Sequence, residues 1–95
     1  MQCERLVFSR HAIQRMFERA ISTAEVRQAV VSGETIEEYP EADPYPGVLI
    51  LGFPRAGRPL HIVVGRNPEG TCFVVTVYEP DNNLWIDGFK RRKRR

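Results

Sequence analysis

The fold is decided by residues 48–79, VLILGFPRAGRPLHIVVGRNPEGTCFVVTVYE, which contain three apolar runs separated by two short turns. The runs occupy residues 48–53, 60–66 and 72–79. They are rich in β-branched and aromatic side chains, which favour strands, while segments 54–58 and 67–70 contain the Pro and Gly typical of turns. Strands joined by loops this short are antiparallel neighbours, so the stretch predicts a three-stranded meander.

Two amphipathic helices are expected upstream of these strands. In the first, over residues 9–20, Ser9 is a candidate N-cap, and the apolar residues form one arc that a core would bury. In the second, Ser22 and Glu25 form a capping-box pattern. Gly33 is expected to end this helix in the left-handed conformation, which glycine adopts without steric cost. The arc of the first helix comprises Ala12, Ile13, Met16, Phe17 and Ala20.

A fourth strand is expected at residues 35–39, before a Pro-rich irregular segment. The order is therefore two N-terminal helices followed by about four antiparallel strands, which predicts an α+β fold with both helices packed on the sheet. A chain of 95 residues builds one modest core. We therefore expect a single domain over residues 1–89, followed by a disordered tail over residues 90–95.

Charge is unevenly distributed along the chain. Of the 14 basic residues, 6 form the tail 90–95, which leaves 8 basic against 12 acidic residues and a net charge of −4 in the body. Segment 34–43 holds five acids and no base. Six adjacent like charges repel and carry no apolar anchor, so the tail should be mobile. Such a tail either binds nucleic acid or acts as a solubilising extension.

Cys3 and Cys72 are the only cysteines. The first residues lack the apolar core and cleavage site of a signal peptide, so we expect a cytoplasmic protein in which both thiols are reduced. Zinc requires about four closely spaced ligands, and two cysteines with the distant His11 and His61 do not fit, so no metal or other cofactor is expected. No apolar run approaches the roughly 20 residues of a membrane span, so no membrane partner is expected.

His11, Arg15 and Arg19 recur at intervals of four in the first helix, with Glu18 beside them. Residues four apart share one face of a helix, and this face lies opposite the apolar arc. A histidine and two guanidiniums together suit proton transfer beside a phosphate. The alternative is a solvated helix face that carries one ion pair.

His61 is the only other histidine, and it lies in a predicted strand on the face opposite Leu60 and Ile62. If the sheet pairs as a meander, His61 shares a face with Thr76 and Tyr78. That face would present an imidazole, a hydroxyl and a phenol close together. The alternative is a structural histidine packed among valines.

These residue types are the ones that a metal-independent ribonuclease uses. Such an enzyme needs a base for the ribose 2′-hydroxyl, an acid for the leaving 5′-oxygen and a cation for the phosphate. Histidine serves as base or acid near neutral pH, arginine binds two phosphate oxygens, and exposed aromatics stack on bases. The motifs of P-loop enzymes, zinc proteases and nucleophile-elbow hydrolases do not occur in the sequence.

The chain resembles a bacterial and archaeal domain-of-unknown-function family, "forty-two fifty-eight", over residues 6–85. The runs that carry the resemblance are FSRHAIQRMFERAISTAEVRQAVVSGETIEEYP, LILG, RPLHIVV and TVYEPDNNLW. That family is similar to the RelE/barnase-like ribonuclease toxins in its order of helices and sheet, and its members are often encoded beside small zinc-finger antitoxins. The resemblance implies a toxin-like ribonuclease fold with its site on the sheet and the edge of the first helix. The matched positions are His11, Arg15, Glu18, Arg19, Gly33, His61, Thr76 and Tyr78.

We therefore expect a metal-independent endoribonuclease of a toxin–antitoxin pair, with RNA as substrate and a small zinc-finger antitoxin as partner. His11 would act as general base or acid, Arg15 and Arg19 would bind phosphate, His61 would be the partner acid or base, and Tyr78 would orient or stack. The alternative is a non-enzymatic protein-interaction or RNA-binding module of the same fold. Convergence of His11, Arg15 and His61 in one pocket favours the enzyme, whereas burial of His61 among valines favours the module.

Overall fold

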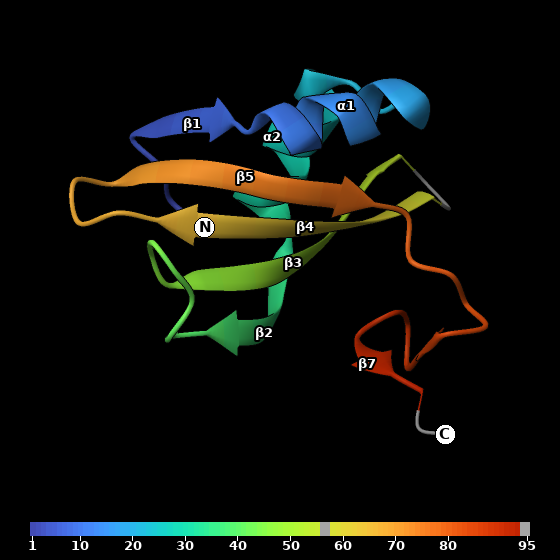
Figure 1. Cartoon of the computed structure of the whole chain (residues 1–95). Coiled ribbons are helices and arrows are strands. Elements are labelled where there is room, and N and C mark those ends of the chain that lie inside the picture. Colours follow the sequence, from blue (N-terminus) through green and yellow to red (C-terminus); the bar gives the residue numbers. More distant parts are fainter. Residues whose placement is uncertain (56–57, 94–95) are drawn as a thin grey trace.

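The computed structural model describes residues 1–55 and 58–93, and it shows two helices packed on one face of a five-stranded sheet (Figure 1). The elements in chain order are β1 (Arg5–Phe8), α1 (Arg10–Glu18), α2 (Thr23–Ser32), β2 (Glu34–Tyr39), β3 (Gly47–Arg55), β4 (Arg58–Arg66), β5 (Thr71–Tyr78), β6 (Trp85–Ile86) and β7 (Arg91–Arg92). The middle of the predicted turn 54–58, residues 56–57, lies outside the described residues.

The predicted fold class, two N-terminal helices on a four-stranded antiparallel RelE/barnase-like sheet, is wrong. The sheet has five strands in the order β1-β5-β4-β3-β2 and is mixed, because β1 pairs with β5 in parallel. Strands β2 to β5 form the antiparallel meander, but β1 precedes both helices, which therefore lie between β1 and β2 in the chain. The four residues of β1, RLVF, are too few for alternation to reveal a strand.

Both helix starts follow from their caps. The Ser9 hydroxyl accepts a hydrogen bond from the Ala12 amide at 3.0 Å, and α1 begins at the next residue, Arg10. Ser22 and Glu25 form the predicted capping box, with both of its hydrogen bonds at 3.0 Å. Each bond satisfies an amide that a helix terminus leaves without an intrahelical partner.

The main core lies between the helices and the sheet. The apolar arc predicted for α1 is only half buried, because α1 packs along β5 near one edge of the sheet: Phe17 is 89% exposed and Ile13 is 47% exposed. The fully enclosed members of this core are Ala12, Met16, Ile21, Val26, Ala29, Val30, Ile50, Leu60, Ile62, Val64, Cys72, Val74 and Val77.

Two glycines allow α2 to approach β3 closely. Gly33 ends α2 with φ −78°, so the predicted left-handed conformation is wrong. The residue is needed for space, because a Cβ there would lie 2.6 Å from Ile50 Cγ2 and 2.7 Å from the Leu51 carbonyl oxygen. A Cβ on Gly52 would lie 2.5 Å from Ala29 Cβ. Any side chain at either position would therefore push the helix away from the sheet.

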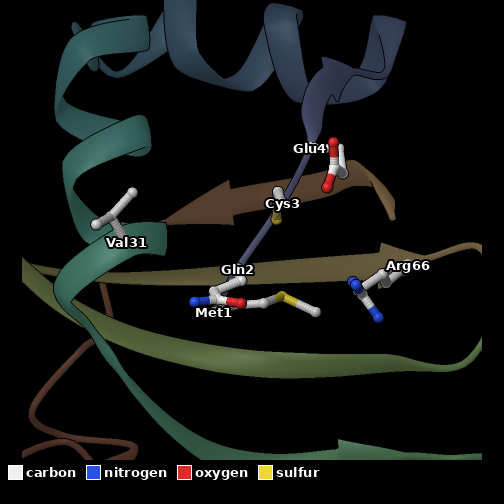
Figure 2. Close-up of a pocket in the computed structure, with 6 residues that line it drawn as sticks. All are labelled: Met1, Gln2, Cys3, Glu4, Val31 and Arg66. Carbon is white, nitrogen blue, oxygen red and sulfur yellow. The ribbon is translucent and has the colours of Figure 1, made fainter. Parts of the chain in front are cut away.

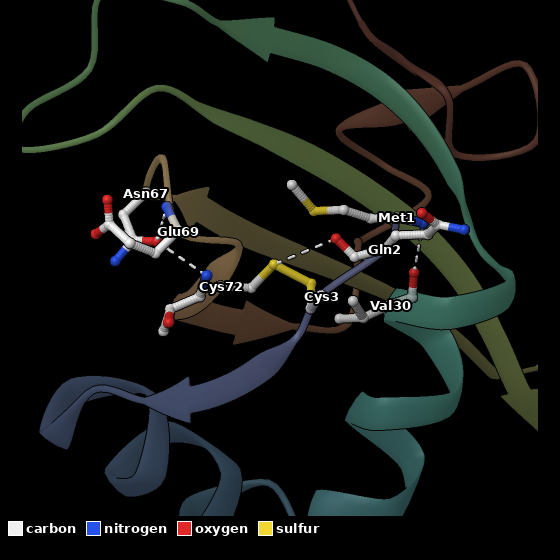
Figure 3. Close-up of a disulfide and its surroundings, with 8 residues drawn as sticks. Met1, Gln2, Cys3, Val30, Asn67, Glu69 and Cys72 are labelled. Atoms are coloured by element: carbon white, nitrogen blue, oxygen red, sulfur yellow. Dashed lines mark hydrogen bonds between the residues drawn. A yellow bond between two sulfur atoms is a disulfide. The ribbon is translucent and has the colours of Figure 1, made fainter.

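Cys3 and Cys72 form a disulfide, so the prediction of two reduced thiols is wrong (Figure 3). The parallel pairing of β1 with β5 sets Leu6 opposite Cys72, and this brings the chain just before β1 alongside the start of β5. The two cysteines are 69 positions apart, and their proximity depends on the parallel strand that the sequence did not reveal.

The basic C-terminal segment begins in a small hairpin. Strand β7 pairs with β6, the Lys93 amide donates to the Leu84 carbonyl at 2.7 Å, and Lys90 forms an ion pair with Glu34 at 3.1 Å. These contacts involve residues 90–93 of the expected tail, and residues 94–95 lie outside the described residues. The domain boundary after residue 89 and the mobility of the tail stay predictions.

The helices of the described ranges, α1 with 9 residues and α2 with 10, are too short to cross a membrane.

Candidate functional site

His61 is buried on the sheet face opposite the helices, which we call the second face. Its side chain is 0% exposed. The ring Nε2 lies 2.8 Å from the Phe89 carbonyl oxygen, which can only accept, so Nε2 carries the proton and donates. The other nitrogen, Nδ1, accepts from the Tyr78 hydroxyl at 3.1 Å. The Trp85 ring packs edge-on against the imidazole, with the two ring centroids 4.4 Å apart. The hairpin formed by β6 and β7 therefore covers His61.

The surroundings of His61 favour its neutral form. Burial lowers its pKa below the ordinary value of 6.5, because desolvation penalises the imidazolium, although the Phe89 carbonyl and the charge of Glu37 act in the opposite direction. Burial likewise raises the pKa of Tyr78. Both ring nitrogens of His61 are thus hydrogen-bonded within the protein, to the Phe89 carbonyl and the Tyr78 hydroxyl.

The predicted catalytic residues fall into two groups, and the sheet separates them. His61 and Tyr78 are opposite each other on the second face, as register pairs of β4 and β5. His11 and Arg15 belong to α1 and Arg19 caps its end, and α1 packs on the helix side of the sheet through Ala12 and Met16.

The helix-side residues make local contacts. Arg15 pairs with Glu18 at 3.2 Å, and both side chains are more than 40% exposed. The Arg19 guanidinium donates to the Val77 carbonyl at 3.2 Å and so ties the end of α1 to β5. His11 is exposed. The roles predicted for His11, Arg15 and Arg19 stay predictions.

The second face also carries an apolar groove, beyond His61 toward the start of β3. Val63 and Gly65 of β4 and Phe73 and Val75 of β5 form one side, and the connection between β2 and β3 forms the other. The cavity measures about 400 Å³. Its lining residues are Tyr39, Ala42, Asp43, Pro44, Tyr45, Gly47, Val63, Gly65, Phe73 and Val75.

Aromatic side chains give this groove its shape. The rings of Tyr45 and Phe73 stack with their centroids 5.5 Å apart and their planes 13° from parallel. The Tyr39 hydroxyl donates to Glu37 at 2.7 Å, and burial together with this carboxylate raises the pKa of the phenol. Gly65 leaves the hollow open because it has no side chain. The sequence contained a signal for this site that our predictions did not use: Tyr39 and Tyr45 bracket the Pro-rich segment that we treated only as irregular.

A second hollow of about 370 Å³ lies beside the disulfide and contains no aromatic residue. Figure 2 shows Arg66 and Glu4 on one side of it and Val31 on the other. Its full lining is Met1, Gln2, Cys3, Glu4, Val31 and Arg66. Mixed polarity without convergent groups makes it a weaker candidate site than the groove.

Among the described residues one carboxylate is buried, and it is fully paired. Glu25 contacts Arg58 at 2.9 Å and Arg55 at 3.3 Å, and it accepts the Ser22 amide. The Ser22 amide, followed by the two guanidiniums, lowers the pKa of Glu25 despite its burial. Arg58 also donates to the Arg19 carbonyl at 3.2 Å, so it joins the α1–α2 connection to β4. Across residues 1–55 and 58–93, no three His, Cys, Asp or Glu side chains cluster as metal ligands would.

Comparison with known proteins identifies a family. No curated protein and no solved structure matches the chain, so the similarity to RelE/barnase-like toxins receives no support. Residues 8–79 match the family described as Domain of unknown function (DUF4258). This match runs from the last residue of β1 to just past the end of β5 and so includes both helices and the whole meander. The chain therefore belongs to the DUF4258 family.

Proposed function

We propose that this chain is a non-enzymatic protein-interaction module whose groove on the second face binds apolar side chains of a partner protein. The observation that carries the proposal is the groove itself: an open cavity of about 400 Å³ with a stacked Tyr45–Phe73 pair in its lining. This volume lies within the roughly 300–1,000 Å³ of typical ligand pockets, which are also mainly apolar. Aromatic residues are enriched in the parts of protein interfaces that contribute most to binding.

The state of the histidines supports a binding role over a catalytic one. His61 has both ring nitrogens hydrogen-bonded and lies on the second face, whereas His11 and Arg15 belong to α1, which packs on the other face. An acid–base pair must reach the same phosphodiester from two sides, and residues separated by a sheet do not do so. The groove also contains a carboxylate, Asp43, which repels the phosphates of RNA.

The identity and location of the partner are also proposals. The resemblance implies a small zinc-finger antitoxin, which would be a protein ligand of the kind that we propose. The cytoplasmic location expected from the sequence is likewise a proposal. The Cys3–Cys72 disulfide weighs against that location, because disulfides persist mainly in oxidising compartments.

Filling the groove should abolish binding without unfolding the protein. A Cβ on Gly65 would meet its nearest atom at 3.7 Å, which is ordinary contact, and Gly65 does not have a positive φ. The variant Gly65→Leu should therefore fold and occupy the hollow beside Tyr45. Burial of one large apolar side chain contributes about 1.5–3 kcal/mol, so a groove-bound peptide should lose about 10- to 100-fold in affinity.

The test uses a display library of random short peptides selected on the immobilised full chain. Affinities of the selected peptides are then measured by fluorescence anisotropy for the wild type, Gly65→Leu and the matched control Gly65→Ala, which adds one methyl group and leaves most of the groove open. Circular dichroism and thermal melting check that both variants fold. Peptides that bind all three proteins equally, or a library that yields no binder, would contradict the proposed function.

An endoribonuclease remains the second candidate, because the exposed His11 lies on α1 with Arg15. If this candidate is right, purified protein should cleave single-stranded RNA in the presence of a chelator and leave 2′,3′-cyclic phosphates. His11→Ala should then lower the rate by about 10²–10⁴-fold while the melting temperature stays unchanged. Under the interaction-module proposal we expect no cleavage by the wild type, and cleavage that His11→Ala abolishes would replace that proposal.

A further inference from the structure

We infer that the occupant of the groove is a peptide segment that combines an aromatic or large aliphatic anchor with neighbouring Lys or Arg residues. The inference rests on the proposed function and names the chemistry of the partner. It follows from two properties of the second face: the apolar lining of the groove, and the carboxylates of Asp43 in that lining and of Glu37 bonded to it.

The lining determines the anchor. The stacked pair Tyr45 and Phe73 presents ring surface, while Val63 and Val75 add branched aliphatic surface, and Val75 is 47% exposed to solvent. None of the residues that line the groove carries a positive charge. A large apolar side chain would gain most by entering here, because it would cover apolar surface that water now contacts.

The carboxylates determine the charge around the anchor. Asp43 lines the groove, and Glu41, which is exposed, lies two residues before it in the same connection. Glu37 accepts the hydroxyl of the lining residue Tyr39. The segment 34–43 contains no base. Lys90 forms an ion pair with Glu34, which lies at the start of β2 and not in the β2–β3 connection.

A basic side chain satisfies both properties at once. The stem of Lys or Arg packs along apolar surface while its cation contacts a carboxylate, and a guanidinium also stacks favourably on an aromatic ring. Acidic peptides and the phosphates of RNA would meet repulsion from Asp43 and its neighbours. The tail 90–95 of a second copy has the same basic character, so self-association is a competing occupant that the experiment must distinguish.

The experiment compares the composition and the charge dependence of the peptides that require the groove. We expect peptides selected on the wild type and lost on Gly65→Leu to be enriched in Lys and Arg beside an aromatic or aliphatic residue. Their affinity should fall about 3- to 10-fold in the double variant Asp43→Asn/Glu41→Gln, since each exposed ion pair contributes modestly. The matched control is Glu18→Gln, which removes one carboxylate on the helix side and should leave affinity unchanged.

The outcomes separate the inference from the proposed function. Groove-dependent peptides without a basic excess, or with equal affinity for the double variant and the wild type, would overturn the inference and leave the interaction module standing. Absence of any groove-dependent peptide would overturn both. Sedimentation that shows a dimer of the wild type and a monomer of Gly65→Leu would replace the peptide partner by a second copy of this chain.

Discussion

Breaking the Cys3–Cys72 disulfide should lower the free energy of unfolding by about 4 kcal/mol, which is a large fraction of the stability of a domain this small. The disulfide joins residues 69 positions apart, so it closes most of the chain into one loop and restricts the unfolded state. In the chain-entropy account, a loop of that length corresponds to about 4 kcal/mol. Without the disulfide, β1 should be the first strand to separate from the sheet, because in the described part of the chain this four-residue strand pairs with β5 alone.

The measurement is urea unfolding of the wild type with and without reductant, together with the double variant Cys3→Ala/Cys72→Ala. Reduction and the double substitution should each shift the unfolding midpoint strongly downward. Reductant should have no effect on the double variant, which controls for effects unrelated to the thiols. A thiol assay on the native, unreduced protein should detect no free cysteine. Two reactive thiols and a midpoint that ignores reductant would show that the bond does not form.

Local signals predicted much of the fold, and long-range pairing accounts for most of what was missed. Ser9 and Ser22 marked the helix starts because capping depends on residues within one turn. Three strands of the meander were evident from apolar runs and short turns, and the fourth was expected at residues 35–39, before the Pro-rich segment. Strand β1 was not, because its partner β5 begins more than 60 residues later, and a four-residue strand has no pattern of its own. The disulfide depends on that pairing and was missed with it.

The candidate site was also predicted where local signals decide the structure and missed where distant segments meet. His61 and Tyr78 are opposite each other, as the predicted shared face requires, but strict alternation along β5 would put Tyr78 on the helix side with Cys72 and Val74. An irregularity in the β4–β5 pairing, which skips Val75, turns Tyr78 to the second face instead. That Trp85 and Phe89 contact His61 could not be predicted. The sequence of the β6–β7 hairpin does not indicate which part of the sheet the hairpin packs against. Because the sequence does not reveal this contact, it suggests an exposed His61 that could act as a base.

Replacing His61 should therefore destabilise the protein rather than disable a catalyst. His61→Ala would leave a cavity against Trp85 and remove the partners of the Phe89 carbonyl and the Tyr78 hydroxyl. Truncation of a large buried side chain and loss of buried hydrogen bonds together should lower the free energy of unfolding by about 2–4 kcal/mol. The matched control, His11→Ala at an exposed helix position, should change stability by less than about 0.5 kcal/mol.

The pH dependence of stability gives a second and independent readout of the same residue. Because burial lowers the pKa of His61 in the folded protein, the unfolded chain binds a proton that the folded chain excludes. The contribution of neutral His61 to the free energy of unfolding should therefore be fully present above about pH 6.5. It should fall as the pH drops toward the folded pKa, by up to about 1.4 kcal/mol per pH unit.

Urea unfolding of the wild type, His61→Gln and His11→Ala between about pH 5 and 8 measures this slope. His61→Gln should lose the slope and His11→Ala should keep it. A wild type whose stability is flat across this range would contradict a buried neutral imidazole and restore His61 as a proton-exchanging group.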